Sequence, residues 1–113
     1  YLWASWCAPC RAEAATLANV KRALAAEDVH FLGLNTRDGL VAAQAFSRRF
    51  PTYYPSIQDQ QGVLTLAFGQ IGPAATPTTF VLDRKGRVAA RILGVVTEAQ
   101  LREVTMSVVE EVE

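Results

Sequence analysis

The sequence predicts a single α/β domain in which a mixed central sheet is covered by helices on both faces. Three observations carry this prediction. Strand-like and helix-like segments alternate in the first half of the chain, which favours parallel strands joined by helices. Two β-rich runs, residues 78–83 and 87–93, flank Arg84-Lys85-Gly86 and are typical of an antiparallel hairpin with glycine in its turn. With 113 residues, the chain is large enough for one modest hydrophobic core.

Four elements are predicted in the first half, in the order strand, helix, strand, helix: residues 2–6, 8–26, 29–35 and 40–50. The first helix is amphipathic, because Leu17, Val20 and Leu24 recur at helical spacing. Pro9 is compatible with its first turn, where no amide donor is needed. The two strands are short and apolar, as expected for buried parallel strands. Pro51 ends the second helix.

The second half has a weaker pattern. Residues 55–57 favour a short strand and residues 63–68 a short helix, and the glycine and two prolines of residues 72–77 indicate a loop. After the hairpin, Thr97 and Gln100 have the spacing of a capping box, which opens a last helix near the C-terminus. No internal repeat or low-complexity linker interrupts the sequence.

Composition and charge narrow the classes of function. Half of the residues are hydrophobic and 19% are charged, which is typical of a globular protein rather than a disordered one. Eleven basic residues balance eleven acidic ones, so neither nucleic-acid binding nor attraction to a strongly charged partner is expected. No apolar run reaches the ~20 residues of a membrane span.

The chain opens directly on the strand residues Tyr1-Leu2-Trp3, without a signal peptide. A sheet protein rarely begins inside a strand, so we expect an N-terminal portion to be missing. Such a portion would add one or more strands to the sheet and would carry an export signal or a lipid anchor.

The only two cysteines are three positions apart, in Trp6-Cys7-Ala8-Pro9-Cys10 at the start of the first predicted helix. Thiols at this spacing can close a disulfide and open it again. The free amides and the dipole of a helix N-terminus favour a thiolate at Cys7, and the thiolate is the attacking species. Cys10 lies one helical turn further and would resolve the mixed disulfide that Cys7 forms with a partner protein.

Three alternative roles of the cysteine pair are open. A structural disulfide across two intervening residues closes a very small loop, so it would remove little entropy from the unfolded state. A zinc site would need two more ligands, and the only histidine is His30, with no third cysteine. Two unrelated buried cysteines are disfavoured by the neighbouring tryptophan and proline. Thiol–disulfide chemistry is therefore the favoured interpretation, with no metal and no cofactor.

These residues resemble a known family. A Trp-Cys-x-Pro-Cys motif after a short strand, followed far downstream by Thr76-Pro77 before another strand, is similar to the thioredoxin superfamily. More narrowly, residues 3–13, Trp-Ala-Ser-Trp-Cys-Ala-Pro-Cys-Arg-Ala-Glu, resemble the TlpA/ResA-like branch of extracytoplasmic thiol–disulfide oxidoreductases. The resemblance implies a thioredoxin-like, three-layer α/β/α fold over residues 1–113, with the extra strand and helix of this branch inserted at about residues 53–70.

The resemblance implies a role for each residue of the motif. Cys7 is the exposed nucleophile, and Cys10 is the resolving cysteine. Glu13 assists proton transfer and tunes the thiols, which is chemically reasonable for a carboxylate one helical turn after Cys10. The alternative for Glu13 is an ordinary solvated glutamate on a helix.

The substrate-binding residues that the resemblance implies lie around the cysteines. Pro77 corresponds to the family's cis-proline, which faces the disulfide, and the backbone at Thr76 can pair with an extended substrate segment. Trp6 and Pro9 would line the groove that receives the partner protein. The alternatives are a trans-proline that ends the loop and, for Trp6, a partly buried core aromatic.

Two positions depart from the family pattern. Thioredoxins have a buried aspartate six residues before the first cysteine, where this chain has Tyr1, so that proton relay is absent. Many relatives have a proline five residues after the second cysteine, where this chain has Ala15, so the first helix should be straighter.

The favoured function is a thiol–disulfide oxidoreductase that acts on exported proteins as a reductant, for example of apocytochrome c thiols. The alternatives are an oxidant that forms disulfides, a redox-inert thioredoxin-like binding module, and a thiol peroxidase of the related peroxiredoxin branch. The partners implied are protein thiol or disulfide substrates and a membrane or extracytoplasmic redox partner, with no nucleic acid, and the protein is expected to be a monomer. We expect an extracytoplasmic location, with a membrane anchor in an N-terminal segment absent from this chain.

Overall fold

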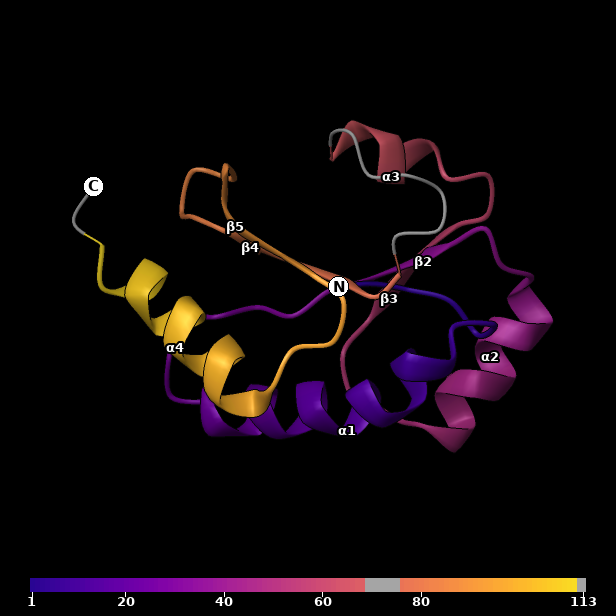
Figure 1. Cartoon of the computed structure of the whole chain (residues 1–113), viewed down its shortest axis with the longest axis horizontal. Helices are drawn as coiled ribbons and strands as arrows, with labels where there is room; N and C mark the ends of the chain where they lie inside the picture. The colour runs from indigo at the N-terminus through magenta and orange to yellow at the C-terminus, as the bar shows by residue number, and fades with distance from the viewer. Residues whose placement is uncertain (69–75, 112–113) are drawn as a thin grey trace.

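The computed structural model describes residues 1–68 and 76–111. Within these ranges the elements follow the order β1 (Leu2–Trp3), α1 (Ala8–Ala23), β2 (Gly33–Thr36), α2 (Leu40–Arg49), β3 (Ser56–Asp59), α3 (Val63–Ala67), β4 (Thr78–Leu82), β5 (Val88–Leu93) and α4 (Glu98–Val109) (Figure 1). This is the order of strands and helices that the sequence predicts.

β1 lies in the centre of the sheet, whose strand order is β3-β2-β1-β4-β5. β1, β2 and β3 are parallel to one another, with Leu2 paired to Leu34 and Leu34 paired to Ile57. β4 is antiparallel to both of its neighbours, β1 and β5. The sheet is therefore mixed, as predicted, and its central strand leads directly to the cysteines.

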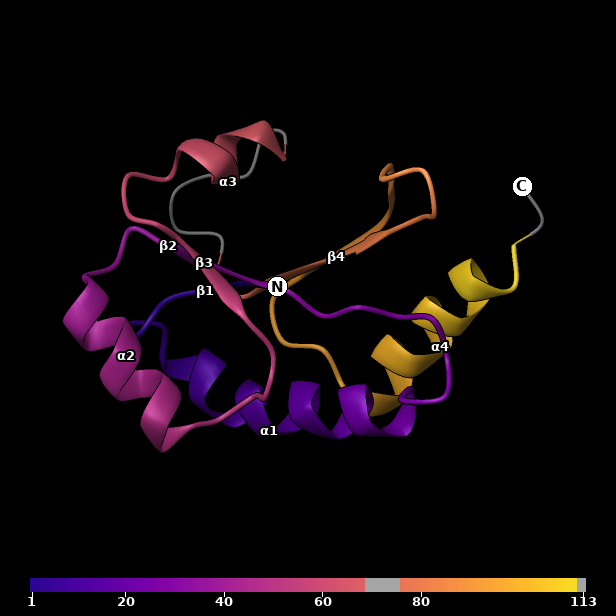
Figure 2. The ribbon, with the colours of Figure 1, turned by 180° about the vertical axis from the view of Figure 1, so that it is seen from behind.

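Helices lie on both sides of this sheet. α1, α2 and α4 are on one side, and the short α3 is on the other (Figure 1 and Figure 2). α4 contacts both α1 and β4, so the last helix closes over the same face as the helix that carries the cysteines. The predicted layering is confirmed.

The main core lies between the sheet and the helices α1 and α4. Leu17, Val20 and Leu24 are buried along α1, as their helical spacing predicts. They pack against Val81 of β4 and Leu101 of α4. Burial of this apolar face fixes α1 against the sheet, and with it the first turn that holds the cysteines.

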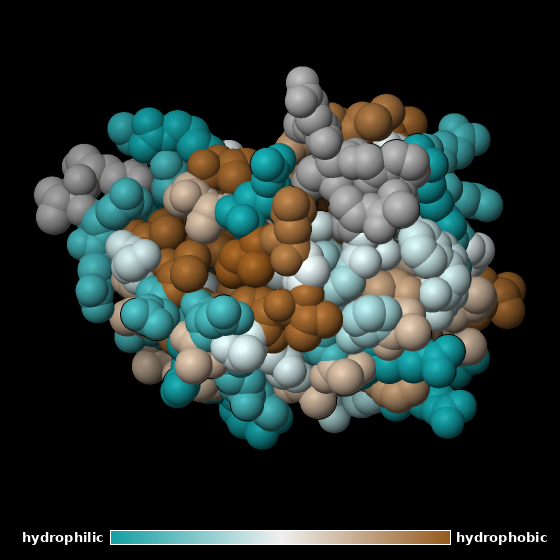
Figure 3. All heavy atoms as spheres, viewed as in Figure 1, coloured by the Kyte–Doolittle hydropathy of each residue, from teal (hydrophilic) through white to brown (hydrophobic). Residues whose placement is uncertain are grey.

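The rim of this core reaches the surface. Figure 3 shows apolar side chains gathered between the sheet and α4 on the face that it presents. Val29, Phe31 and Val104 are partly buried and pack against the core cluster. Val29 and Phe31 are therefore in contact with the core without belonging to a strand.

Two strands are shorter than predicted. β1 ends at Trp3 because the chain turns there, and the Cys7 amide donates to the Ala4 carbonyl at 3.1 Å. β2 begins only at Gly33, where Ser56 of β3 starts to pair with it. An apolar run indicates contact with the core. In this chain, contact with the core begins before the residues that pair as β2.

β3 and α3 form where the sequence favours a short strand and a short helix. The Asp59 carboxylate, at the end of β3, accepts hydrogen bonds from the amides of Leu64 and Thr65 at 3.2 and 2.8 Å, which stabilises the start of α3. Of the loop predicted at residues 72–77, residues 72–75 lie outside the described residues.

The predicted hairpin between β4 and β5 is confirmed. Gly86 has a φ of +79°, a left-handed conformation that favours glycine. The Asp83 carboxylate accepts hydrogen bonds from the amides of Lys85 and Arg87, both at 2.9 Å. An aspartate that bonds to the backbone of its own turn is a common way to fix such a loop.

Replacing Thr97 with alanine is expected to lower the free energy of unfolding by about 1 kcal/mol. The Thr97 hydroxyl accepts from the Gln100 amide at 3.1 Å and the Gln100 side chain accepts from the Thr97 amide at 3.0 Å, so the predicted capping box is confirmed. Urea unfolding measures the loss. As a control, Ser107→Ala removes an exposed hydroxyl from the same helix and should change stability by less than about 0.5 kcal/mol. Equal losses in the two variants would contradict the capping role.

Candidate functional site

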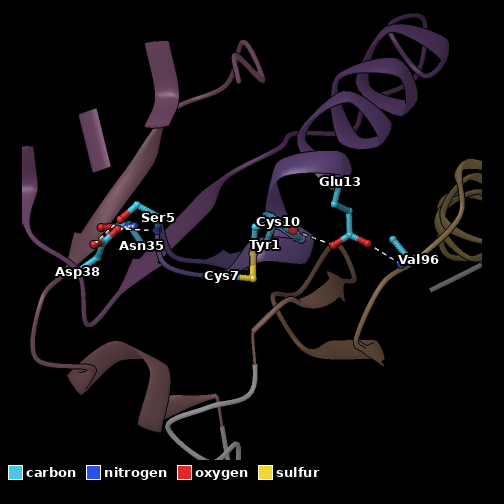
Figure 4. Close-up of a disulfide and its surroundings, with 8 residues drawn as sticks. All are labelled: Tyr1, Ser5, Cys7, Cys10, Glu13, Asn35, Asp38 and Val96. Atoms are coloured by element: carbon cyan, nitrogen blue, oxygen red, sulfur yellow. Dashed lines mark hydrogen bonds between the residues drawn. A yellow bond between two sulfur atoms is a disulfide. The ribbon is translucent and has the colours of Figure 1, made fainter. Parts of the chain in front are cut away.

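Cys7 and Cys10 form a disulfide at the start of α1, with their Cα atoms 5.4 Å apart (Figure 4). Cys7 is the N-cap residue of α1 and has an extended backbone, and Pro9 lies in the first turn. The first amides of a helix have no acceptor within it, so the positive end of the helix dipole lies at Cys7. Both cysteines are thus where the sequence places them.

Both cysteine side chains are buried in this disulfide form. The resemblance implies an exposed Cys7, and the structure differs: Cys7 is 4% exposed and Cys10 is 1% exposed. The reason is that the pair packs into a cluster with Trp3, Ala4 and Ala43. Of the two cysteines, Cys7 therefore keeps the larger contact with solvent.

Trp6 projects from the surface directly before Cys7. It is 51% exposed, which contradicts the alternative of a core aromatic. Its indole Nε1 donates a hydrogen bond to the carbonyl of Arg37 at 3.0 Å, and Arg37 has a left-handed φ of +50°. The loop between β2 and α2 therefore holds the exposed indole in place.

A buried carboxylate in the same loop holds the turn that precedes the cysteines. Asp38 is 6% exposed and accepts hydrogen bonds from the amide and the hydroxyl of Ser5, both at 2.7 Å (Figure 4). The Asn35 side chain and the Gly39 amide also donate to it, at 3.1 and 3.0 Å. Since Ser5 lies between β1 and Cys7, Asp38 connects the β2–α2 loop to the start of α1.

Asp38 is ionised at neutral pH. Burial alone would raise the pKa of its carboxyl, but the hydrogen bonds from Asn35, Ser5 and Gly39 together outweigh burial and hold the pKa below its ordinary value. An ionised carboxylate is an acceptor only, which suits a site with four donors.

Glu13 is enclosed in α1, one turn after Cys10. It is 1% exposed, so the alternative of a solvated glutamate is wrong. Its Oε1 accepts from the Tyr1 hydroxyl at 2.6 Å, and its Oε2 accepts from the Val96 amide at 2.5 Å (Figure 4). Residues three apart on a helix are neighbours, so Glu13 and Cys10 lie on the same side of α1. Tyr1, where the sequence indicates a missing proton relay, is hydrogen-bonded to this carboxylate.

A cavity of about 270 Å³ reaches the inner side of this site. Cys10 and Tyr1 line it, together with aromatic residues that include Trp3, Phe46 and Tyr54. The cavity therefore borders both Cys10 and the tyrosine that is hydrogen-bonded to Glu13.

The peptide bond between Thr76 and Pro77 is cis, and Pro77 is buried. The Pro77 carbonyl accepts from the Gly94 amide at 2.8 Å, and the following residue, Thr78, pairs with Leu2 of β1. The Thr76–Pro77 step thus enters the sheet beside the strand that leads to the cysteines.

Sequence reasoning missed Asp38 and the contact of Tyr1. An Asp-Gly pair, such as Asp38-Gly39, indicates a turn, and a turn aspartate is ordinarily solvated. One signal could have pointed further. Asp38 follows a buried strand that is parallel to β1, and the carboxyl ends of parallel strands meet at one edge of the sheet. The same edge carries the cysteines.

Within residues 1–68 and 76–111, no three His, Cys, Asp or Glu side chains are grouped so that they could hold a metal ion. His30 is exposed and pairs with Asp28 at 3.1 Å. A search of the same ranges finds no helix with the length and apolar character that crossing a membrane requires.

Two curated relatives align with most of this chain. The thiol:disulfide interchange protein HelX of Rhodobacter capsulatus is 36% identical over 97 residues, and the thiol-disulfide oxidoreductase ResA of Geobacillus thermodenitrificans is 29% identical over 101 residues. These alignments cover 85% and 89% of this chain but 51% and 56% of the relatives. The chain therefore spans about half the length of the curated relatives that it matches.

A solved structure confirms the thioredoxin-like α/β fold. The secreted thiol-disulfide isomerase of Corynebacterium glutamicum superposes with a TM-score of 0.88 at 35% identity, over 97% of this chain and 68% of that one. These relatives are named for thiol–disulfide chemistry, and this chain carries a Cys-x-x-Cys pair at disulfide distance. The TlpA/ResA-like resemblance is thereby confirmed. The Redoxin family model matches residues 1–107, and the chain belongs to this family.

Proposed function

We propose that the protein is a thiol–disulfide oxidoreductase that exchanges its Cys7–Cys10 pair with the thiols or disulfides of exported proteins. One observation carries the proposal: a disulfide joins the N-cap cysteine of a helix to a second cysteine one turn later. The interchange protein HelX and the oxidoreductase ResA, both similar to this chain, support it.

The exchange proceeds in two steps when the protein acts as a reductant. The Cys7 thiolate attacks one sulfur of a partner disulfide, and the other partner sulfur leaves as a thiolate. Cys10 then loses its proton to Glu13 and attacks the Cys7 sulfur. The Cys7–Cys10 bond forms, the bond from Cys7 to the partner breaks, and two electrons have passed to the partner.

The partner protein docks around the exposed edge of the disulfide. Trp6 and Pro9 are both exposed, which supports their role as a contact surface. The backbone at Thr76 and Pro77 pairs with an extended segment of the substrate, as an added strand would. As a reductant, the protein would act on oxidised cysteine pairs of exported proteins, for example those of apocytochrome c.

The domain covers residues 1–113, with the strand and helix within about residues 53–70 as the insertion that distinguishes the TlpA/ResA-like branch. The protein acts as an extracytoplasmic monomer that is anchored to the membrane through an N-terminal segment. A membrane or extracytoplasmic redox partner reduces its disulfide again after each exchange. The similarity to a secreted isomerase supports the location.

The reduction potential of the Cys7–Cys10 pair decides the direction of electron flow. For a reductant we expect a value below about −200 mV, because reducing couples on this fold lie at about −200 to −270 mV and a strong oxidant lies near −120 mV. Equilibration in glutathione buffers, followed by alkylation of free thiols, measures it. A potential above about −150 mV would overturn the reductant and favour an oxidant that forms disulfides.

A further inference from the structure

The two oxygens of the buried Glu13 carboxylate have different partners. Oε1 accepts from the Tyr1 hydroxyl at 2.6 Å, and Oε2 accepts from the Val96 backbone amide at 2.5 Å (Figure 4). Because Glu13 is only 1% exposed, a proton that it receives from Cys10 has no direct way to bulk water. The proton must leave through one of these partners or return to Cys10.

Tyr1 connects Glu13 to solvent space. Tyr1 and Cys10 both line the cavity of about 270 Å³, whereas Glu13 and Val96 are not among the described residues that line it. The cavity has room for several water molecules and has polar groups on its wall, including the hydroxyls of Ser47 and Thr52.

We propose that Tyr1 is a positioning residue for the resolving step: its hydroxyl holds the Glu13 carboxylate beside Cys10 and passes the proton of Cys10 on to the cavity. The inference rests on the proposed function of the cysteine pair. In the mixed disulfide a partner protein covers the exposed edge of Cys7. A route for the proton through the cavity, which borders Cys10, stays open while the partner is bound.

The step balances without a further reactant. Glu13 takes the S–H proton of Cys10, and the Cys10 thiolate attacks Cys7, whose bond to the partner breaks as the partner leaves as a thiolate. The Glu13 carboxyl gives its proton to the Tyr1 oxygen while the Tyr1 O–H proton moves to a cavity water. A hydroxyl donates and accepts at the same time, which the Val96 amide cannot do.

The ionisable groups around Glu13 fit this role. They are Cys10 on its own helix, Tyr1 before β1 and Tyr54 before β3. Burial, and then the hydrogen bond and negative charge of Glu13, raise the pKa of Tyr1 far above its ordinary value. Burial is also the main cause that raises the pKa of Tyr54. Both phenols stay protonated at neutral pH, so the Tyr1 hydroxyl remains a donor.

Tyr1→Phe tests the proposal in a reaction that reports the two cysteines separately. One equivalent of dithiobis(nitrobenzoate) is mixed with the reduced protein in a stopped-flow instrument. Attack by Cys7 releases the first thionitrobenzoate, and resolution by Cys10 releases the second. We expect the first release to be unchanged within about twofold and the second to slow about tenfold or more, because phenylalanine neither holds the Glu13 carboxylate in place nor passes a proton on. The dependence of the second release on pH should also change, because the carboxylate that receives the proton of Cys10 has lost a hydrogen-bond donor.

Tyr54→Phe is the matched control. Tyr54 lines the same cavity, but its hydroxyl bonds to Thr52 rather than to Glu13, so both releases should be unchanged. Glu13→Gln should slow the second release as Tyr1→Phe does. In the wild type, a solvent deuterium isotope effect on the second release that varies nonlinearly with the deuterium fraction reports two protons moving together, as a relay through Tyr1 requires, even where Tyr1→Phe unfolds.

The outcomes separate the relay from the proposed function. A normal second release and pH profile in Tyr1→Phe, with slowing in Glu13→Gln, would overturn the role of Tyr1 and leave the oxidoreductase function intact. Equal slowing of both releases would indicate a merely structural role and also overturn it, as would an isotope effect that is near unity or varies linearly with the deuterium fraction. A wild type without any second release would contradict the function of the cysteine pair itself.

Discussion

Replacing Cys7 with serine is expected to abolish thiol–disulfide exchange down to the rate without protein. A serine hydroxyl is not ionised at neutral pH and cannot form a bond to a partner sulfur, so the first step has no nucleophile. Cys10 cannot substitute for Cys7, because it lies in the first turn of α1 with its side chain only 1% exposed. The rate at which the reduced protein precipitates insulin by cutting its disulfides measures the loss.

The Cys10→Ser variant is the matched control, since it removes the other half of the same disulfide. It should keep the first attack and accumulate a mixed disulfide between Cys7 and the substrate, because no thiol is left to resolve it. Non-reducing electrophoresis detects the adduct, and dithiothreitol should release it. Adducts in Cys7→Ser, or an inactive Cys10→Ser without adducts, would contradict the assignment of nucleophile and resolving cysteine.

The features that the sequence predicts correctly are formed by residues that lie close together in the sequence. Thr97 and Gln100 are three positions apart, and their capping box forms as the spacing indicates. Gly86 takes the left-handed conformation that the hairpin turn requires. The positions of Cys7 and Cys10 on the first turn of α1 follow in the same way from the helix pattern after them.

The features that the sequence does not reveal depend on distant residues. Asp38 bonds to Ser5 across 33 positions, and Glu13 bonds to Val96 across 83. A local sequence pattern indicates whether a residue suits a turn or a helix face, but it does not indicate which element packs over that residue. Tyr1 is an example: its departure from the family pattern indicates a lost carboxylate, and only the fold brings its hydroxyl to Glu13.

Replacing Asp38 with asparagine is expected to lower the free energy of unfolding by about 3 kcal/mol at neutral pH. Each carboxylate oxygen of Asp38 accepts two hydrogen bonds: Oδ2 from Ser5 and Asn35, and Oδ1 from Ser5 and Gly39. The amide nitrogen of asparagine cannot accept, so two of the four donors lose their acceptor whichever way the amide turns. Urea unfolding measures the loss. The variant should also react more slowly at Cys7, because the turn through Ser5 is no longer fixed.

Asp38→Asn should also make the free energy of unfolding less dependent on pH in the acid range. Because the pKa of Asp38 is below its ordinary value in the folded protein, its contribution is present above about pH 4 and is lost as the pH falls through the folded-state pKa. The difference between wild type and Asp38→Asn should therefore shrink in acid. Asp59→Asn is the control, since Asp59 is another buried carboxylate with a lowered pKa, but it bonds to Leu64 and Thr65 at α3. It should lose stability in the same way while the first thionitrobenzoate release from Cys7 stays unchanged. If both variants slow the first release from Cys7 equally, the effect comes from general destabilisation, and Asp38 has no specific part in shaping the site.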